Sequence, residues 1–494
     1  MKEQIFRLGQ KAAIYGIGSI LNRFISFLLL PLFTRYLTPS DYGISSILGW
    51  MAFLVTPVFS LGIGAAMAPL YFEKGDPSRK EATVWSTFII LLVSSSMLVV
   101  LGMQFANYWS KLAFQTSDHH YLVSITFLST GLSILSIPLV LHLQFEERAK
   151  LFAAFTIITT FVSIGSNLLL VVVFHRGVQG VIEGNLITQA ANLILFAFPA
   201  FSKLRFRFQL TLARELLRLG IPLIPAFAFL FLLQQGNRYI LQMFGGLDQV
   251  GIYTIGYNFG LVMSVPVDAL TVAWVPYFMS FIDRREEARM LFGRIVTLYV
   301  IGFGFLSLMF YIFAKPVVML MTQPAFHGAY QVVGLSATAY FLSGLYSLLL
   351  PGMYFAKEVK YQTLIQGIAA VLGIGANLLL IPNLKVLGTG LGLTFGYFCM
   401  VFLTALWNLI RKPHYLQIQY EWKRILIWCV FYVAYMVLMQ WNRSFSLVGE
   451  GIFSVLALVP LPFVIYALLN SWERQNAIQF FRQLDARLFK RISD

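Results

Sequence analysis

The motifs of this chain occur twice, at a nearly constant separation along the sequence. The segment Ile164–Leu170 returns almost unchanged as Ile374–Leu380, 210 residues later (374 − 164). Gly43 returns as Gly251, 208 residues later (251 − 43). A duplication of this length predicts two structurally similar halves with a shared interface between them.

Composition places both halves in a membrane. Hydrophobic residues make up 58% of the chain, charged residues only 12%, and the mean hydropathy is +0.75. Soluble domains do not have this balance, and a spanning helix needs about 20 apolar residues. We predict an all-α integral membrane protein with about fourteen spans, near residues 11–34, 42–72, 84–107, 121–144, 151–174, 180–201, 220–244, 250–281, 292–314, 329–355, 362–383, 387–410, 424–441 and 449–470.

The distribution of Lys and Arg predicts the orientation. If the N-terminus is cytoplasmic, 28 of the 36 basic residues fall in cytoplasmic loops and 6 in external loops. The positive-inside rule then places both termini in the cytoplasm, which requires an even number of spans. The net charge of +15 follows from this topology and from contact with anionic lipids, so it does not indicate nucleic-acid binding.

The duplication divides the chain into three parts. Residues 1–203 and 204–413 each hold six spans, so they form two parallel six-helix bundles related by a pseudo-two-fold axis along the membrane normal. A basic interfacial helix near 203–219 begins the second bundle. Residues 414–494 add two spans and a basic amphipathic tail over 473–492. The spans 42–72 and 250–281 are longer than a bilayer requires and contain prolines, which predicts kinks or interfacial extensions.

No pattern in the chain points to catalysis. No loop is long enough to fold as a catalytic domain, and we find no carboxylate pair, Ser-His-Asp set or phosphate-binding loop. Cys399 and Cys429 both lie in apolar spans and have no metal-ligand spacing. We therefore predict no enzyme, no catalytic residue, no cofactor and no metal site.

Arg23 lies near the middle of the first span. It is twelve residues from both Lys11 and Arg35, or about 18 Å from each along a helix. Polar neighbours, including Asn22 and Ser26, accompany it, which indicates a helix face toward a wet cavity or a partner helix. We predict that Arg23 and Asn22 bind an anionic ligand; the alternative is an Arg that locks helices together through carbonyl groups.

Arg238 occupies the corresponding span of the second repeat. Gln234 lies one turn before it, and Asn237 and Gln235 extend the polar patch. We predict Arg238, Asn237 and Gln234 as substrate-binding residues; structural pairing is the alternative for Arg238.

Two acidic residues complete the candidate site. Asp268 lies deep in the eighth span and either carries a coupling ion or balances the charge of Arg238 or Arg23. Tyr257 and Ser264 can share its helix face. Glu183 lies near the outer end of the sixth span. We predict that it takes part in ion coupling or charge balance; the alternative is that it lies at the membrane interface without either role.

The energetics favour a wet cavity around these charges. A central Arg or Asp costs about 2.5–3.5 kcal/mol on insertion scales, so three of them facing lipid would cost about 8–10 kcal/mol. They must be paired or hydrated. Two arginines against one carboxylate leave a positive excess, which suits an anionic ligand, and guanidinium groups bind phosphate oxygens well.

Two segments resemble a known family. Leu30–Gly43 (LPLFTRYLTPSDYG) and Ala273–Tyr277 (AWVPY) are similar to motifs of Wzx-type polysaccharide flippases, in the multidrug/oligosaccharidyl-lipid/polysaccharide exporter superfamily. The resemblance implies two six-helix bundles around a central cavity, with two extra helices. Relatives often have Asp-Arg where this chain has Asn237-Arg238, so a coupling scheme copied from the family does not transfer directly.

The resemblance also implies a function. A multi-pass protein of the cytoplasmic membrane would move an undecaprenyl-diphosphate-linked oligosaccharide from the inner to the outer leaflet by alternating access, as a monomer, with H⁺ or Na⁺ coupling as an open alternative. Its partners would be the lipid-linked glycan, the bilayer and polysaccharide-assembly proteins. The alternatives are a lipid II-type flippase and a drug/cation antiporter of the same fold.

Overall fold

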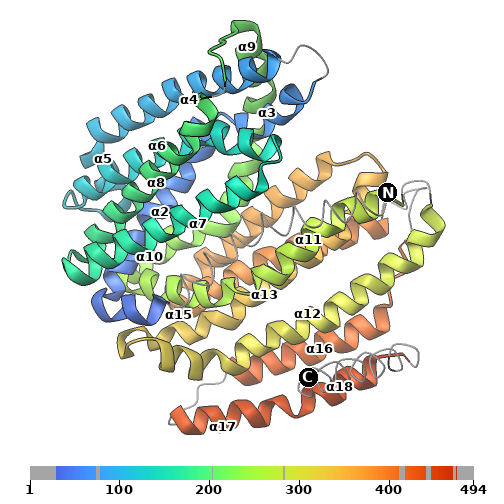
Figure 1. Cartoon of the computed structure of the whole chain (residues 1–494). Coiled ribbons are helices and arrows are strands. Elements are labelled where there is room, and N and C mark those ends of the chain that lie inside the picture. Colours follow the sequence, from blue (N-terminus) through green and yellow to red (C-terminus); the bar gives the residue numbers. More distant parts are fainter. Residues whose placement is uncertain are drawn as a thin grey trace, which may run out of the picture.

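The computed structural model describes residues 29–73, 78–202, 204–281, 284–410, 418–440, 447–470 and 474, and these residues form helices with no strand among them (Figure 1). The elements are α2 (Pro39–Phe59), α3 (Ile63–Tyr71), α4 (Ser78–Gln104), α5 (Ala106–Phe114), α6 (His120–Phe145), α7 (Ala149–Asn167), η1 (Leu168–Val173), α8 (Gly177–Phe201), α9 (Leu210–Gly220), η2 (Ile221–Leu223), α10 (Ile224–Leu261), α11 (Ser264–Met279), α12 (Arg285–Met321), η3 (Pro324–Ala329), α13 (Tyr330–Leu349), α14 (Pro351–Phe355), α15 (Lys360–Ile410), α16 (Trp422–Gln440), α17 (Leu447–Leu458) and α18 (Pro460–Leu468).

The helices agree with the predicted all-α membrane fold. In the described part of the chain, ten helices are long and apolar enough to cross a membrane, or eleven if the bent pair Leu210–Phe229 and Phe231–Leu261 counts as one span. Helices α10 and α15 each contain parts of two predicted spans. Most of the first predicted span, with Arg23 and Asn22, lies outside the described residues.

The chain folds back on itself within α10 and within α15. Gly246 in α10 and Lys385 in α15 leave the helical backbone conformation. In α15, a Cβ built on Gly373 would lie 3.2 Å from the Cα of Gly396, 23 residues later in the sequence. Such closeness requires an antiparallel hairpin. The predicted separate spans 362–383 and 387–410 are therefore both present within α15.

Both spans predicted to be kinked are interrupted. Leu61 and Gly62 have φ values of 54° and 62°, and they separate α2 from α3. The corresponding break in the second repeat falls between Leu261, where α10 ends, and Ser264, where α11 begins. The prediction of kinks there is confirmed.

The repeated Asn-containing motif packs a helical hairpin in each half. Asn167 and Asn377 each donate a hydrogen bond within their own helix, to Ser163 and Gly373 (2.7 and 2.8 Å). The amides fill space opposite a glycine, since a Cβ on Gly184 would lie 3.2 Å from the Asn167 side-chain carbon.

Equivalent residues of the two repeats touch each other where α2 crosses α10. A Cβ on Gly43 would lie 2.8 Å from the carbonyl carbon of Leu247, and one on Gly251 would lie 2.7 Å from that of Pro39. Leu247 and Pro39 are themselves 208 residues apart, like the two glycines. Residues related by a two-fold axis approach each other only close to the axis, so the pseudo-two-fold axis passes through this crossing.

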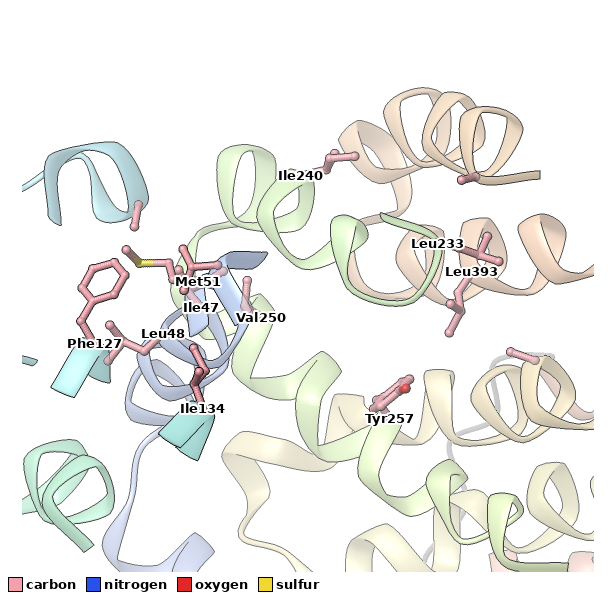
Figure 2. Close-up of a cluster of buried hydrophobic side chains, with 14 of the residues drawn as sticks. Ile47, Leu48, Met51, Phe127, Ile134, Leu233, Ile240, Val250, Tyr257 and Leu393 are labelled. Carbon is pink, nitrogen blue, oxygen red and sulfur yellow. The ribbon is translucent and has the colours of Figure 1, made fainter. Parts of the chain in front are cut away.

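A hydrogen bond one turn further along marks the same axis. The hydroxyl oxygens of Ser46 and Thr254, again 208 residues apart, lie 2.9 Å from each other. The crossing lies at the beginning of α2, which is the outer end in the predicted topology. Figure 2 shows Ile47, Leu48 and Met51 of α2 close to Phe127 of α6 and Val250 of α10, which belong to one buried cluster. The two repeats thus share a core at this end.

The short helix α5 adds a polar contact across the same end. Its last carbonyl groups accept hydrogen bonds from α10: the Tyr239 hydroxyl donates to Leu112 (3.0 Å) and the Gln242 amide to Ala113 (2.6 Å). Trp50 of α2 stacks on the Tyr239 ring, with centroids 5.0 Å apart. These contacts join the repeats at the end where α2 begins.

The linker helix α9 packs on the first repeat, although the sequence division placed it with the second. It contacts α3 and α4, and ion pairs join Arg207 to Glu81 (3.5 Å) and Arg79 to Glu215 (3.7 Å). The linker helix is thus held against the first repeat by apolar packing and ion pairs.

The last helices pack on α12 of the second repeat. The Tyr432 hydroxyl of α16 lies 2.8 Å from Ser307 of α12 and 2.7 Å from Thr338 of α13. Lys315 of α12 forms a 2.7 Å ion pair with Glu450 of α17, whose side chain is fully buried. The extra helices therefore form one packed unit with the second repeat.

Removing Glu450 is expected to loosen this unit. In Glu450→Ala, the Lys315 ammonium is left largely buried without its carboxylate, which costs about 3–5 kcal/mol for a buried pair. Thermal unfolding of the detergent-solubilised protein measures this loss. Glu287→Ala, at an exposed pair with Arg284, is the matched control and should leave the unfolding temperature nearly unchanged. Equal unfolding temperatures for Glu450→Ala and Glu287→Ala would contradict the prediction.

Candidate functional site

The polar patch predicted on the seventh span is part of a buried cluster in the second repeat. Asn237 is only 1% exposed, and its amide donates a 2.8 Å hydrogen bond to the Tyr253 hydroxyl. Asn237 and Tyr253 lie on the two arms of α10, on either side of the reversal at Gly246. This bond therefore fixes the register of the hairpin beside Arg238.

Arg238 is held by an aromatic ring. Its guanidinium carbon lies 5.1 Å from the ring centroid of Tyr257, one turn after Tyr253 on the second arm of α10. The Tyr257 hydroxyl lies 2.6 Å from that of Tyr340 on α13. Among the described residues, no carboxylate lies within 4.0 Å of the Arg238 guanidinium, and its Nε has no hydrogen-bond partner. The charge is thus partly buried, and no described residue neutralises it with an ion pair.

Gln234 connects this cluster to a cavity between the repeats. A cavity of about 310 Å³ is bounded by α2 residues from Phe53 to Ser60 and by Phe227, Phe231 and Gln234 of α10. Gln234 also contacts the Tyr397 hydroxyl of α15 through its side chain. A predicted binding residue therefore lines a space between the two repeats and contacts the tyrosine cluster.

Asp268 lies on the open face of α11. Its side chain is exposed, whereas Val267, Trp274 and Phe278 of the same helix are buried in the second repeat. Asp268 also lies near enough to Tyr397 for an electrostatic interaction. Asp268 is therefore within electrostatic range of the tyrosine that Gln234 contacts.

Ser264 lies on the same helix as Asp268, as the helical spacing suggested, but Tyr257 does not. The break between α10 and α11 lies between Tyr257 and Asp268. Ser264 is 1% exposed, while Asp268 is exposed. Tyr257 instead contacts Arg238.

Glu183 lies apart from this cluster, on α8. It pairs with Arg176 and accepts 2.9 Å hydrogen bonds from the Tyr121 hydroxyl and the Gln179 amide. Its carboxylate is thus satisfied by neighbours in the first repeat.

Of the predicted site residues, the structure brings Gln234, Asn237 and Arg238 together in one cluster. Asp268 lies within electrostatic range of this cluster, whereas Glu183 lies apart from it. Arg23 and Asn22 lie outside the described residues.

The tyrosines of this cluster were missed as site residues. Tyr253 and Tyr257 are four residues apart, which places them on one helix face. That spacing was visible in the sequence. Their partners Asn237 and Arg238 come from the other arm of a hairpin, so the pairing required the structure.

The helices and the inter-repeat cavity define a class of protein: a multi-pass membrane protein with the fold of flippases and multidrug transporters. Solved structures show this likeness. The lipid II flippase MurJ, in an inward closed conformation, matches with a TM-score of 0.70 and 14% identity, over 92% of this chain and 99% of its own. An inward-facing MATE family multidrug transporter matches with a TM-score of 0.61 and 13% identity, over 79% of this chain and 94% of its own.

Sequence comparison identifies the family. Residues 8–282 match the family described as polysaccharide biosynthesis protein, and the chain belongs to that family. A protein of the Lsg locus of Haemophilus influenzae is 24% identical over 285 residues, covering 56% of this chain and 67% of that protein.

Proposed function

We propose that this protein moves an undecaprenyl-diphosphate-linked oligosaccharide from the inner to the outer leaflet of the cytoplasmic membrane. The observation that carries the proposal is the Arg238 guanidinium, which is held by tyrosines close to a cavity between the repeats and has no carboxylate partner among the described residues. Such a group retains its positive charge for a diphosphate.

Arg23 is the second cationic group of the proposed site. It lies in the predicted first span, which corresponds to the span of Arg238 in the second repeat, and it would bind the same diphosphate. Alternating access then moves the head group through the cavity while the polyprenyl chain stays in lipid. Coupling to H⁺ or Na⁺ would act through Asp268.

Reconstitution tests the proposed function. Purified protein in liposomes is expected to move a fluorescent polyprenyl-diphosphate disaccharide across the bilayer, measured by accessibility to a membrane-impermeant quencher. Arg238→Gln should lower the rate, whereas Arg214→Gln, on the linker helix α9, should not. A wild-type rate no higher than that of empty liposomes would contradict the proposal.

The shape of the cationic group at residue 23 gives a separate prediction. Arg23→Lys is expected to retain several-fold more transport than Arg23→Ala, because the charge survives while the two-pronged geometry for phosphate oxygens is lost. Transport is compared at equal protein in the reconstituted assay. Equal rates for Arg23→Ala and wild type would exclude Arg23 from the site.

A lipid II-type flippase is the second candidate, favoured by the fold match to MurJ. Both substrates carry a polyprenyl diphosphate, so the proposed guanidinium site does not separate them. Competition by unlabelled lipid II against the fluorescent disaccharide distinguishes the two. Stronger competition by lipid II than by the unlabelled disaccharide would favour this second candidate.

The proposed orientation has its own test. With both termini in the cytoplasm, reporter fusions in external loops should report the outside and those in cytoplasmic loops the inside. Opposite results at any two positions would overturn the topology. The external positions are Asp118, His327 and Arg443, and the cytoplasmic ones are Asp76, Arg285 and Asp494.

A further inference from the structure

We infer that Tyr257, braced by Tyr340, positions the Arg238 guanidinium to bind the diphosphate of the lipid-linked substrate. The inference rests on the proposed function and assigns a positioning role to two residues that do not themselves bind the diphosphate. Its basis is the chain of contacts from Arg238 to Tyr257 to Tyr340, which spans both arms of α10 and α13.

The first step concerns how a guanidinium can be held in a low-dielectric interior. A carboxylate partner would stabilise the charge but would also cancel it and occupy its N–H donors. The face of a tyrosine ring attracts the cation and accepts no conventional hydrogen bond from it. Arg238, 5.1 Å above the Tyr257 ring, therefore keeps its charge and in-plane donors for an anion.

The second step concerns what holds the ring. Tyr257 is 7% exposed, and its hydroxyl lies 2.6 Å from the Tyr340 hydroxyl. Tyr253 packs against this ring, with ring centroids 5.9 Å apart, and its hydroxyl accepts a hydrogen bond from Asn237. The ring is thus held from α13 and from the first arm of α10. A guanidinium lying on a fixed ring has fewer accessible orientations before the ligand arrives.

The third step concerns the incomplete hydrogen bonding of Arg238. Its Nε is buried and has no hydrogen-bond partner among the described residues. A buried unpaired donor is uncommon in proteins and is often a sign of function. The Nε–H is therefore available, together with the other guanidinium N–H groups, to donate to the oxygens of a diphosphate.

Binding measurements on the full-length protein in detergent test the inference. The probes are geranyl diphosphate and geranyl phosphate, which differ by one phosphate. Tyr257→Leu should weaken geranyl diphosphate binding about threefold to thirtyfold, the range of a cation–π contact that is partly desolvated. Tyr340→Phe and Tyr257→Phe keep the ring but remove the brace, and each should give a smaller loss of the same kind.

Two controls separate positioning from general damage. Tyr346→Leu removes another buried tyrosine of α13, whose hydroxyl is bonded to Gln366 (3.2 Å), and should not change the preference for diphosphate over monophosphate. Tyr257→Leu should reduce that preference. In the Arg238→Gln background, Tyr257→Leu should cause no further loss, because the group that it positions is absent.

The outcomes distinguish the inference from the proposed function. If Arg238→Gln leaves geranyl diphosphate binding unchanged, Arg238 is not a diphosphate ligand and the proposed site fails together with the inference. If Arg238→Gln weakens binding but Tyr257→Leu acts like Tyr346→Leu, the proposed site stands and the positioning role is wrong. A loss of diphosphate preference in Tyr257→Leu that vanishes in the Arg238→Gln background supports the inference.

Discussion

Alanine at both Gly43 and Gly251 is expected to stop transport almost completely while leaving the protein in the membrane. The two glycines allow α2 and α10 to touch at the pseudo-two-fold axis, and a Cβ at either position would overlap a carbonyl group of the opposite repeat. Overpacking of this kind costs about 1–3 kcal/mol per site. The cost falls only on the conformation in which the repeats are in contact at this end, so the equilibrium should shift away from it.

Cross-linking measures that shift directly. The Ser46 and Thr254 hydroxyls lie 2.9 Å apart, so a Ser46→Cys/Thr254→Cys pair should form a disulfide when the repeats are in contact. With alanine at both glycines, the disulfide yield should fall several-fold, together with transport. Gly49→Ala is the matched control, since it lies on α2 with nothing within 4 Å of the added Cβ. Unchanged yield and transport would show that the crossing plays no part in the transport cycle.

The membrane constraint explains why the sequence predicted the fold so well. Every backbone polar group in a bilayer must be satisfied within a helix, so long apolar segments predict spans directly. The kinks near Pro57 and Pro266 followed from the length of two spans and their prolines, and the breaks at Gly62 and after Leu261 confirm them.

The contact between α2 and α10 at the pseudo-two-fold axis could not be predicted from the sequence. The 208-residue separation of Gly43 and Gly251 identifies them as equivalent positions. Equivalence, however, says nothing about distance from the axis, which depends on how the two bundles pack. Ile164–Leu170 and Ile374–Leu380 also occupy equivalent positions in the two repeats, yet they lie within separate hairpins. Only the packing of the helices shows which equivalent residues meet at the axis.

The site shows a second limit, set by helix breaks and hairpins. Helical spacing placed Tyr257 and Asp268 on one helix face, but the break between α10 and α11 puts them on separate helices. The actual partner of Tyr257 is Arg238, across the reversal at Gly246. Periodicity applies only within a continuous helix, so contacts across a turn are invisible to it.

Asp268 and Arg238 are expected to depend on each other. Both interact electrostatically with the tyrosine cluster, Asp268 with Tyr397 and Arg238 with Tyr340. If Asp268 serves to balance the charge of Arg238, then Asp268→Asn leaves excess positive charge in the cluster, and Arg238→Gln leaves a carboxylate near the site. We expect each single change to lower reconstituted transport about tenfold or more, because a change of one unit charge within a spanning segment is worth about 2.5–3.5 kcal/mol on insertion scales.

A double-mutant cycle decides between charge balance and ion coupling. In the balancing case, Asp268→Asn together with Arg238→Gln should be more thermally stable than either single variant and lose less transport than the two losses combined, since the net charge of the cluster is restored. In the coupling case, Asp268→Asn alone should abolish the dependence of transport on a proton or sodium gradient while leaving geranyl diphosphate binding intact. We favour the balancing role, because Asn237 provides no acid beside Arg238 and Asp268 approaches the same tyrosine cluster. Strictly additive losses in both stability and transport would exclude the balancing role and assign Asp268 to ion coupling.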